Sequence, residues 1–307
     1  MFGSPEIAFW RPVRRELEPE RSSGSRVRVL VTGSNGQLGL ELAELLPERG
    51  HEVAALSRRE LDITDAGAAD RAIEEHAPEV VVNAAAFTNV DLCETETEAA
   101  YAVNALGPRN LARACERRGA SLLHVSTNYV FDGAQERPYE PFDAARPISA
   151  YGRTKLAGEE YVMRLTNRWT VVRTAGVYGR GHNFVRTMLR VAAERDVLKV
   201  KDDEFVSPTY ARDLAGGIIQ ILETEGYGLY HLTNAGSCSW YEFTREIFRL
   251  GNVGTELVPI PNSDYPLPAA RPAHGVISTL GSPTLRHWQE ALADYLEREA
   301  ATAAAQG

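Results

Sequence analysis

From residue 26 onward, short runs of apolar residues alternate with longer segments in which apolar residues recur at helical spacing. The short runs are bounded by turn residues and predict buried strands at 27–32, 51–57, 80–85, 121–126 and 170–174. The first helical segment, near 37–49, places four leucines on one face. This βαβα alternation predicts an α/β fold, a doubly wound parallel (Rossmann) sheet with helices on both faces.

The pattern changes after about residue 178, where it becomes less regular and richer in proline. We expect a smaller, loop-rich α/β substrate lobe in this part of the chain. The dinucleotide-binding domain is then 26–178 plus about 204–233, and the substrate lobe is about 179–203 plus 234–300. Both ends carry little patterned sequence, so we predict a flexible extension at 1–25 and a tail at 301–307.

Composition excludes several functional classes. The 307 residues are 44% hydrophobic and 24% charged, the balance of an ordinary soluble protein. The net charge of −9 supplies no large basic face, so we expect no nucleic-acid partner. No run approaches the roughly 18 apolar residues of a membrane span. The three cysteines fit no metal-ligand pattern, so we expect no metal site and a reducing, cytoplasmic location.

A glycine pattern follows the first predicted strand and opens the first predicted helix. Gly33 permits a tight turn, Gly36 lets the backbone approach a pyrophosphate, and Gly39 lets helix and strand pack closely. The helix N-terminus then faces the phosphate charge. We therefore predict a bound dinucleotide, held here by Gly33, Asn35, Gly36, Gln37, Leu38 and Gly39.

The second predicted strand ends in Ser57 and Arg58. An acidic residue at this point would bind a ribose 2′-hydroxyl and favour NAD. A hydroxyl and a guanidinium suit a 2′-phosphate instead, so the sequence favours NADPH, with NADH still possible.

A third pattern, Tyr151 followed four residues later by Lys155, places a phenol and an ammonium on one helix face. A nearby ammonium favours the phenolate and lowers the pKa of a tyrosine. Only three of the 33 basic residues are lysines, so a retained lysine is notable. Ser126 and Thr127 end a predicted strand, where α/β sheets place their ligands. These groups could polarise a carbonyl beside a nicotinamide.

Together these motifs resemble the extended short-chain dehydrogenase/reductases, and within them the dTDP-4-dehydrorhamnose reductase family. The resemblance rests on the segments TGSNGQLG at 32–39, AFTNVD at 86–91, STNYVFDG at 126–133 and YGRTKLAGE at 151–159. It extends to NFVRTML at 183–189, SPT at 207–209 and RP at 271–272. It therefore covers about residues 27 to 298, second-lobe segments included.

The resemblance implies reduction of the 4-keto group of dTDP-4-dehydro-L-rhamnose to dTDP-L-rhamnose, with hydride from NADPH. Tyr151 would donate a proton, Lys155 would hold the nicotinamide ribose, and Thr127 would bind the carbonyl oxygen. Further cofactor contacts would be Asp62, Ile63, Ala84, Ala85 and Ala86. Substrate contacts would be Thr88, Asn128, Tyr129, Gly176, Asn183 and Arg271. A homodimer is expected by family analogy alone.

The sequence departs from the family pattern at three positions. Asn128 stands where the family usually has aspartate, Gly176 where it tends to have tryptophan, and Gly275 where serine is common. We expect the missing aromatic side chain to open the sugar site. A changed sugar specificity is therefore a possible outcome.

Two alternatives stay open. One is another nucleotide-sugar epimerase or dehydratase, although dehydratases place an Asp-Glu pair where this chain has Asn128 and Tyr129. The other is a non-catalytic NADP-binding subunit resembling the regulatory subunit of methionine adenosyltransferase. Outside these motifs, we interpret His124 as a core residue and Asp91 as part of a solvated helix start.

Overall fold

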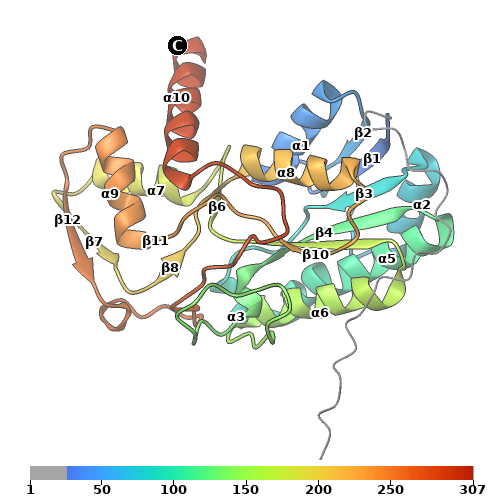
Figure 1. Ribbon diagram of the computed structural model, residues 1–307, viewed down its shortest axis with the longest axis horizontal. Helices are drawn as coiled ribbons and strands as arrows, with labels where there is room; N and C mark the ends of the chain where they lie inside the picture. The colour runs from blue at the N-terminus through green and yellow to red at the C-terminus, as the bar shows by residue number, and fades with distance from the viewer. Residues whose placement is uncertain (1–25, 307) are drawn as a thin grey trace, which may run out of the picture.

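The computed structural model describes residues 26–306, so the extension predicted at 1–25 lies outside the described residues. Its centre is a six-stranded parallel sheet in the order β10-β5-β4-β3-β1-β2 (Figure 1). The strands are β1 (Arg28–Thr32), β2 (Glu52–Leu56), β3 (Val80–Asn83), β4 (Ser121–Thr127), β5 (Trp169–Thr174) and β10 (Gly228–His231). The five predicted strands are confirmed. The strand order reverses between β1 and β3, where such sheets bind their ligands.

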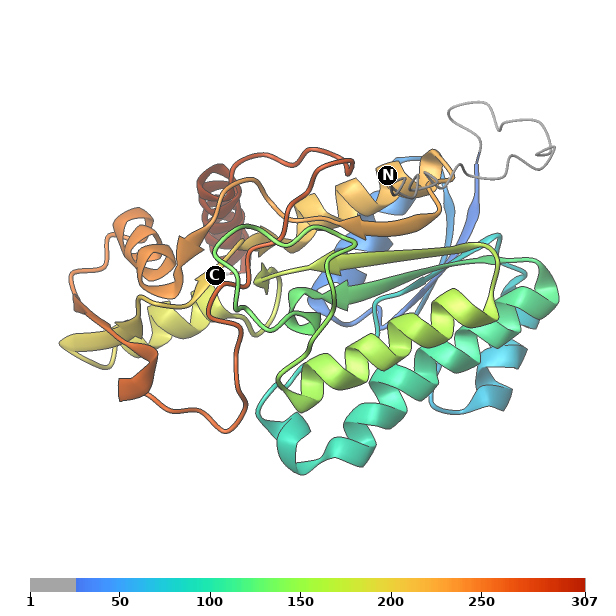
Figure 2. The same cartoon turned by 60° about the horizontal axis from the view of Figure 1, so that its bottom comes forward.

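Helices cover both faces of this sheet (Figure 2). One face packs against α1 (Gln37–Glu48) and α8 (Ala211–Glu223). The other packs against α2 (Ala66–His76), α5 (Gly107–Arg118) and α6 (Ala150–Leu165). The short helices α3 (Leu92–Thr95) and α4 (Thr97–Tyr101) and a π-helical turn (Ala102–Leu106) lead into α5. The doubly wound arrangement is confirmed.

The elements outside the sheet and its covering helices are here called the second lobe; they are short strand pairs and three helices, which lie to the left of the sheet in Figure 1. They include the strands at 177–178, 205–206 and 209–210, which fall within the ranges predicted for the dinucleotide-binding domain. The strand pairs are β6 (Val177–Tyr178) with β9 (Thr209–Tyr210), β7 (Val197–Lys201) with β12 (Glu256–Ile260), and β8 (Phe205–Val206) with β11 (Cys238–Ser239). The helices are α7 (Phe184–Ala192), α9 (Trp240–Leu250) and α10 (Trp288–Gln306). A buried aromatic cluster that includes Tyr178, Phe243 and Trp288 forms its core. Helix α10 runs through most of the segment predicted as a tail.

The three lysines occupy contrasting places. Lys155 is buried on α6, and Lys201 is buried at the end of β7, where it donates to the Glu204 carboxylate at 2.8 Å. Lys199 is exposed on β7. Within 26–306 no helix is long and apolar enough to cross a membrane, and no group of side chains is arranged to hold a metal ion.

Candidate active site

A cleft with a volume of about 1080 Å³ lies at the carboxyl ends of the parallel strands. Most predicted site residues line it: Gly33, Asn35, Gly36, Gln37, Leu38, Ser57, Arg58, Asp62, Ile63, Ala84, Ala85, Ala86, Thr88, Thr127, Asn128, Tyr129, Tyr151, Lys155 and Gly176. Gly39, Asn183 and Arg271 are not on its lining. The sheet therefore brings the cofactor motifs and the hydroxyl groups into one space.

The turn between β1 and α1 depends on its glycines. Gly33 has a left-handed φ of +69°, and a Cβ there would lie 2.8 Å from the Ala85 backbone. Gly36 caps α1 without a side-chain hydrogen bond, so the first N–H groups of the helix have no side-chain partner beside the cleft. A Cβ at Gly39 would lie 2.2 Å from the Gly33 carbonyl oxygen. Gly39 therefore serves helix packing rather than ligand contact.

The edge of the cleft beyond β2 carries two guanidinium groups, on Arg58 and Arg59. The nearby carboxylates are bonded within their own loop. Glu60 accepts the Ser57 N–H at 2.8 Å, and this bond lowers the pKa of Glu60. Asp62 accepts the N–H of Thr64 at 2.9 Å, which lowers the pKa of Asp62. The edge thus carries the guanidinium groups of Arg58 and Arg59, while the Ser57 hydroxyl, like its N–H, is bonded to Glu60.

The hydroxyl groups of Thr127 and Tyr151 meet where β4 ends and α6 begins. Helix α6 starts here because the Ser149 side chain accepts the Gly152 N–H at 3.2 Å. Burial raises the pKa of Tyr151, and a hydrogen bond with Thr127 acts in the opposite direction. The ring of Tyr129 packs edge-on against Tyr151, with 5.5 Å between centroids. The phenol therefore stays protonated at neutral pH and can serve as an acid.

Lys155 is 2% exposed and lies one helical turn after Tyr151. Its ammonium donates to the Val125 carbonyl oxygen at 2.7 Å and lies 3.4 Å from His124 Nε2. Burial lowers the pKa of Lys155 to about 8, while Glu159 opposes that shift. Lys155 is not among the groups that shift the pKa of Tyr151. That Lys155 lowers this pKa therefore stays a prediction.

A buried hydrogen-bond chain crosses three neighbouring strands behind Lys155. The Thr32 hydroxyl donates to Asn83 Oδ1 at 2.6 Å, and Asn83 Nδ2 lies 3.0 Å from His124 Nδ1. The Ala85 N–H also donates to Asn83 Oδ1, so the Nδ2 group must face the histidine. Burial lowers the pKa of His124, which is therefore neutral. The predicted core histidine is confirmed, but its link to Lys155 was not foreseen.

A buried ion pair supports the same strand end from the other side. Glu159 on α6 and Arg173 on β5 pair at 2.6 Å, with side-chain exposures of 0% and 4%. The Ser126 hydroxyl, next to Thr127, donates to Glu159 at 2.5 Å. Arg173 also donates to the Pro141 carbonyl oxygen at 3.0 Å. Sequence reasoning missed this cluster, although a charged residue inside an apolar strand is a signal for a buried pair.

On the second-lobe side, Arg271 forms a bidentate ion pair with Asp91, at 3.0 and 2.8 Å. Burial raises the pKa of Tyr129 to about 12, and Arg271 opposes that shift. Arg271 therefore acts on the cleft wall through Tyr129 and not from the lining itself. Asp91 stands at the start of α3 with its side chain 34% exposed, in line with the interpretation as a solvated helix start, but it is also the partner of this arginine, which was not predicted.

Asn183 has a structural role in place of the predicted substrate contact. It caps α7, because its Oδ1 accepts the Arg186 N–H at 3.0 Å. Its Nδ2 donates to the Tyr295 hydroxyl at 2.9 Å and to the Gly181 carbonyl oxygen at 3.2 Å. Both ends of the amide are thus bonded within the protein, and the residue is buried away from the cleft lining.

Gly176 lines the cleft through its backbone, with a left-handed φ of +53°. A Cβ built there would lie 2.9 Å from the Val206 side chain and 3.2 Å from the Pro208 backbone. A side chain at this position would therefore point into the second lobe. The expectation that its absence opens the sugar site is wrong for this backbone.

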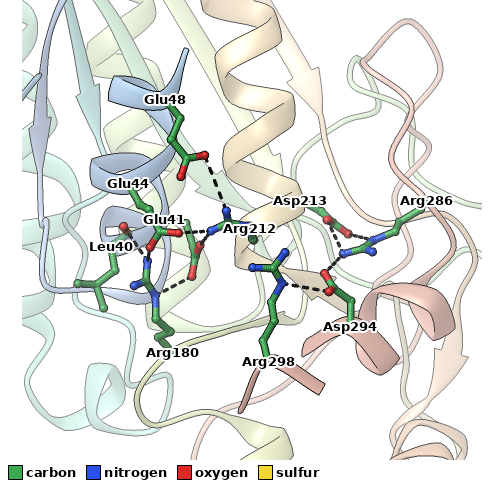
Figure 3. A network of polar contacts seen from close by, with 10 residues as sticks. All are labelled: Leu40, Glu41, Glu44, Glu48, Arg180, Arg212, Asp213, Arg286, Asp294 and Arg298. Atoms are coloured by element: carbon green, nitrogen blue, oxygen red, sulfur yellow. Dashed lines mark hydrogen bonds and ion pairs between the residues drawn. The ribbon is translucent and has the colours of Figure 1, made fainter. Parts of the chain in front are cut away.

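An ion-pair network ties α1 to other parts of the molecule (Figure 3). Arg180, which lines the cleft, donates to Glu41 at 2.8 Å, and Glu41 is 2% exposed. Arg212 on α8 bonds to Glu41 at 3.0 Å and to Glu44 at 2.6 Å. The network continues from α8 to α10 through Asp213, Arg286 and Asp294. Helix α1, which follows the glycine turn, is thus fixed to Arg180 and to α8 by ion pairs.

Comparisons with known proteins agree with this geometry. The family model described as RmlD substrate binding domain matches residues 27–301. The dTDP-4-dehydrorhamnose reductase of Streptomyces griseus is 44% identical over 282 residues, which are 88% of this chain and 93% of that protein. The spore coat polysaccharide biosynthesis protein SpsK of Bacillus subtilis is 40% identical, over 88% of this chain and 97% of that protein.

Among solved structures, the dTDP-4-dehydrorhamnose reductase of Bacillus anthracis in complex with NADP aligns with a TM-score of 0.86. It is 37% identical, and the alignment covers 89% of this chain and all of that one, at 100%. The match spans both lobes and every motif named above. The chain therefore belongs to the dTDP-4-dehydrorhamnose reductase family, the family of the RmlD substrate binding domain.

Proposed function

We propose that this protein reduces the 4-keto group of a nucleotide-linked deoxysugar with NADPH, and that its substrate is dTDP-4-dehydro-L-rhamnose, which becomes dTDP-L-rhamnose. The observation that carries this proposal is the single cleft in which the glycine turn, the Ser57–Arg58 edge and the Thr127–Tyr151 hydroxyl pair face one space. The names of the S. griseus and B. anthracis relatives support the same sugar and cofactor.

The residues present fit a dinucleotide phosphate. Gly33 leaves room where a Cβ would meet the Ala85 backbone, and the start of α1 offers N–H groups that no side chain caps. Arg58 and Ser57 lie where a 2′-phosphate would need a cation and a hydroxyl. Asp62 and Ile63 would line the adenine, and Ala84 to Ala86 the remainder of the cofactor.

When bound, NADPH supplies a hydride to the carbonyl carbon of the sugar. The protein supplies the proton: Tyr151, held protonated by burial, donates to the developing alkoxide. The Thr127 hydroxyl, which donates to Asn128 Oδ1 while no substrate is bound, would turn its proton to that oxygen and stabilise its charge, because it stands beside the phenol at the strand end. The buried Lys155 lines the same cleft and would bind the nicotinamide ribose.

The sugar would lie against Thr88, Asn128, Tyr129 and the backbone of Gly176, all on the cleft lining. Arg271 would act there through Tyr129, and Asn183 would act through the fold of α7. An elimination reaction needs an acid–base pair after Thr127, and the chain has an amide and a phenol there. This difference favours reduction over dehydration.

The test is NADPH oxidation, followed by absorbance, with enzymatically generated dTDP-4-dehydro-L-rhamnose and analysis of the sugar product. Turnover that yields dTDP-L-rhamnose supports the proposal. NADPH binding without turnover would contradict the substrate assignment, and other 4-keto sugar nucleotides would be assayed next. NADPH binding with no reductase activity on any of them would favour the non-catalytic subunit. A lower KM for NADH than for NADPH would overturn the cofactor assignment.

A further inference from the structure

Two residues that the sequence analysis singled out, Asn128 and Gly275, lie in direct contact. Asn128 Nδ2 donates to the Gly275 carbonyl oxygen at 2.8 Å, across 147 residues of sequence. A Cβ at Gly275 would lie 2.6 Å from that same nitrogen. The amide at 128 can reach the carbonyl because position 275 carries no side chain, so the two residues form a matched pair.

The contact joins the two lobes. Asn128 directly follows β4, at the catalytic edge of the sheet. Gly275 lies in the segment 273–275, which pairs with Phe205 of β8. The Phe205 N–H donates to the Ala273 carbonyl oxygen, and the Gly275 N–H donates to the Phe205 carbonyl oxygen. β8 in turn pairs with β11 of the second lobe. The amide of Asn128 therefore forms a direct hydrogen bond between the end of the catalytic strand and a segment that pairs with the second lobe.

The same contact fixes the direction of the hydrogen bonds at Thr127. A carbonyl oxygen only accepts, so the Nδ2 of Asn128 must face Gly275 and its Oδ1 must face Thr127. The Thr127 hydroxyl lies 3.3 Å from that Oδ1 and donates to it. The lone pairs of Thr127 then accept the Tyr129 N–H, at 3.2 Å, and its single proton is shared between Asn128 Oδ1 and the Tyr151 oxygen, whose pKa the Thr127 hydrogen bond lowers.

We propose that Asn128 is a positioning residue that ties the second lobe to the catalytic edge and orients the Thr127 hydroxyl, and that Gly275 admits this contact because it carries no side chain. Asn128 is 4% exposed, and its amide is bonded at both ends. Asn128 shapes the proposed sugar site because its hydrogen bond fixes the segment 273–275 against the end of β4. The consequence for turnover rests on the proposed function, whereas the hydrogen bond between Asn128 and Gly275, called the bridge below, does not.

The near-isosteric variant Asn128→Asp tests the bridge, because an ionised carboxylate cannot donate to the Gly275 carbonyl and a protonated one can. Loss of a buried hydrogen bond beside a new charge should raise KM for dTDP-4-dehydro-L-rhamnose about 10- to 100-fold near pH 8. The increase should shrink as the pH falls toward about 5.5, as the carboxyl gains its proton. The dissociation constant for NADPH should stay within about twofold.

Thermal unfolding of the protein without ligands gives a readout that needs no turnover. The carboxyl group that Asn128→Asp introduces would be buried beside a carbonyl oxygen, so its pKa is raised in the folded state. The stability of this variant is therefore close to wild type at low pH and is lost as the pH rises toward that raised pKa. We expect the unfolding midpoint to fall by about 4 °C or more near pH 8 relative to wild type, and by much less near pH 5.5.

The matched control is Asn252→Asp, which adds the same charge at an exposed position with a φ of +50°. The ionisable groups near this contact on the segments that meet here include Tyr129, Tyr151, Lys155, Glu204, Arg271 and His274. They are common to wild type, control and variant, so the comparison reports the new carboxylate together with its coupling to these groups. A wild-type KM and a wild-type unfolding midpoint for Asn128→Asp near pH 8 would overturn the proposal.

A double-mutant cycle tests the steric half of the proposal. Gly275→Ala places a Cβ against Asn128 Nδ2 and should raise KM about fivefold or more, with a matching fall in unfolding midpoint. In an Asn128→Ala background the amide is gone and the Phe205 carbonyl oxygen, 3.2 Å from that Cβ, is the close neighbour that stays, so the same change should raise KM by no more than about twofold. Independent effects of the two changes would show that the residues do not act as a pair. Without any turnover the proposed function fails, and the unfolding midpoints still decide the bridge.

Discussion

The first-lobe wall of the cleft and the second-lobe wall are assembled in different ways. On the first wall, Gly33, Ser57 and Thr127 each stand at or just after the end of a parallel strand. On the second wall, the contacts join distant parts of the chain: Asp91 and Arg271 are 180 residues apart, and Asn128 and Gly275 are 147 apart. The sheet register places the first set, whereas individual long-range contacts place the second.

This difference predicts how each wall responds when one of its residues is replaced. A residue on the first wall is held by buried strands and by groups such as Glu159 and Asn83, so its replacement should change chemistry without moving its neighbours. On the second wall, the Asp91–Arg271 pair is partly exposed and is held by a few polar contacts. Replacement of Asp91 should loosen the proposed sugar site and leave the proton chemistry intact.

The largest effect should come from Tyr151→Phe, which removes the proposed proton donor of the first wall. We expect kcat to fall about 10³-fold, because general acid catalysis contributes on this scale. The dissociation constant for NADPH, measured by fluorescence titration, should change less than about twofold. Tyr161→Phe on the same helix is the control, since Tyr161 bonds only outside the cleft, to Tyr101. Unchanged turnover in Tyr151→Phe would require a different acid.

The next effect concerns the support of the first wall. Glu159→Gln leaves the Arg173 guanidinium buried without its counter-charge, which should lower the free energy of unfolding by about 3–5 kcal/mol. Glu160→Gln, one residue on, removes an exposed pair with Arg164 and should cost less than about 1 kcal/mol. Urea unfolding of the two variants makes the comparison. Equal losses would show that the buried pair does not support the wall.

The pKa of Lys155 predicts a stability change with pH. Its value of about 8 in the folded protein lies below its ordinary value of 10.5, because burial penalises the ammonium. The unfolded chain therefore binds more protons between these values, and stability should rise with pH by about 3 kcal/mol across that interval. Lys155→Met should remove this rise, as judged by urea unfolding near pH 7.5 and near pH 10. Parallel curves for the two proteins would refute the assignment.

The smallest effect should come from the second wall. Asp91→Asn breaks the bidentate pair with Arg271, whose partners are 34% and 16% exposed, so solvent screening limits the loss to about 1 kcal/mol. We expect KM for the sugar nucleotide to rise about fivefold, with kcat and NADPH binding nearly unchanged. Steady-state kinetics measure all three. A fall in kcat with no change in KM would place this pair in the chemistry instead.

The features that were predictable from the sequence are those that local chemistry determines. Apolar runs predicted the five strands, because a buried parallel strand needs continuous apolar residues. The glycine turn was predictable because only glycine tolerates a φ of +69° against the Ala85 backbone. Strand β10 was missed as a strand, since four residues from Gly228 carry little pattern of their own.

The features that were missed depend on contacts far apart in sequence. Asn183 and Arg271 carry side chains suited to a nucleotide sugar, and both are bonded to other protein groups. No local sequence pattern predicts that Asn183 bonds to Tyr295 or that Arg271 bonds to Asp91. The ammonium of Lys155 similarly donates to the Val125 carbonyl oxygen. This partner is a main-chain group, so the pattern of side chains along the sequence could not predict it.

The distribution of lysines along the fold has a practical consequence. Lys155 is 2% exposed and Lys201 is 8% exposed, whereas Lys199 is exposed on β7 and is absent from the cleft lining. Because only these three lysines occur in 307 residues, an amine-directed reagent has one readily accessible side chain to attack. A dye or a solid support attached through Lys199 would therefore carry the molecule in one orientation, with its cleft free.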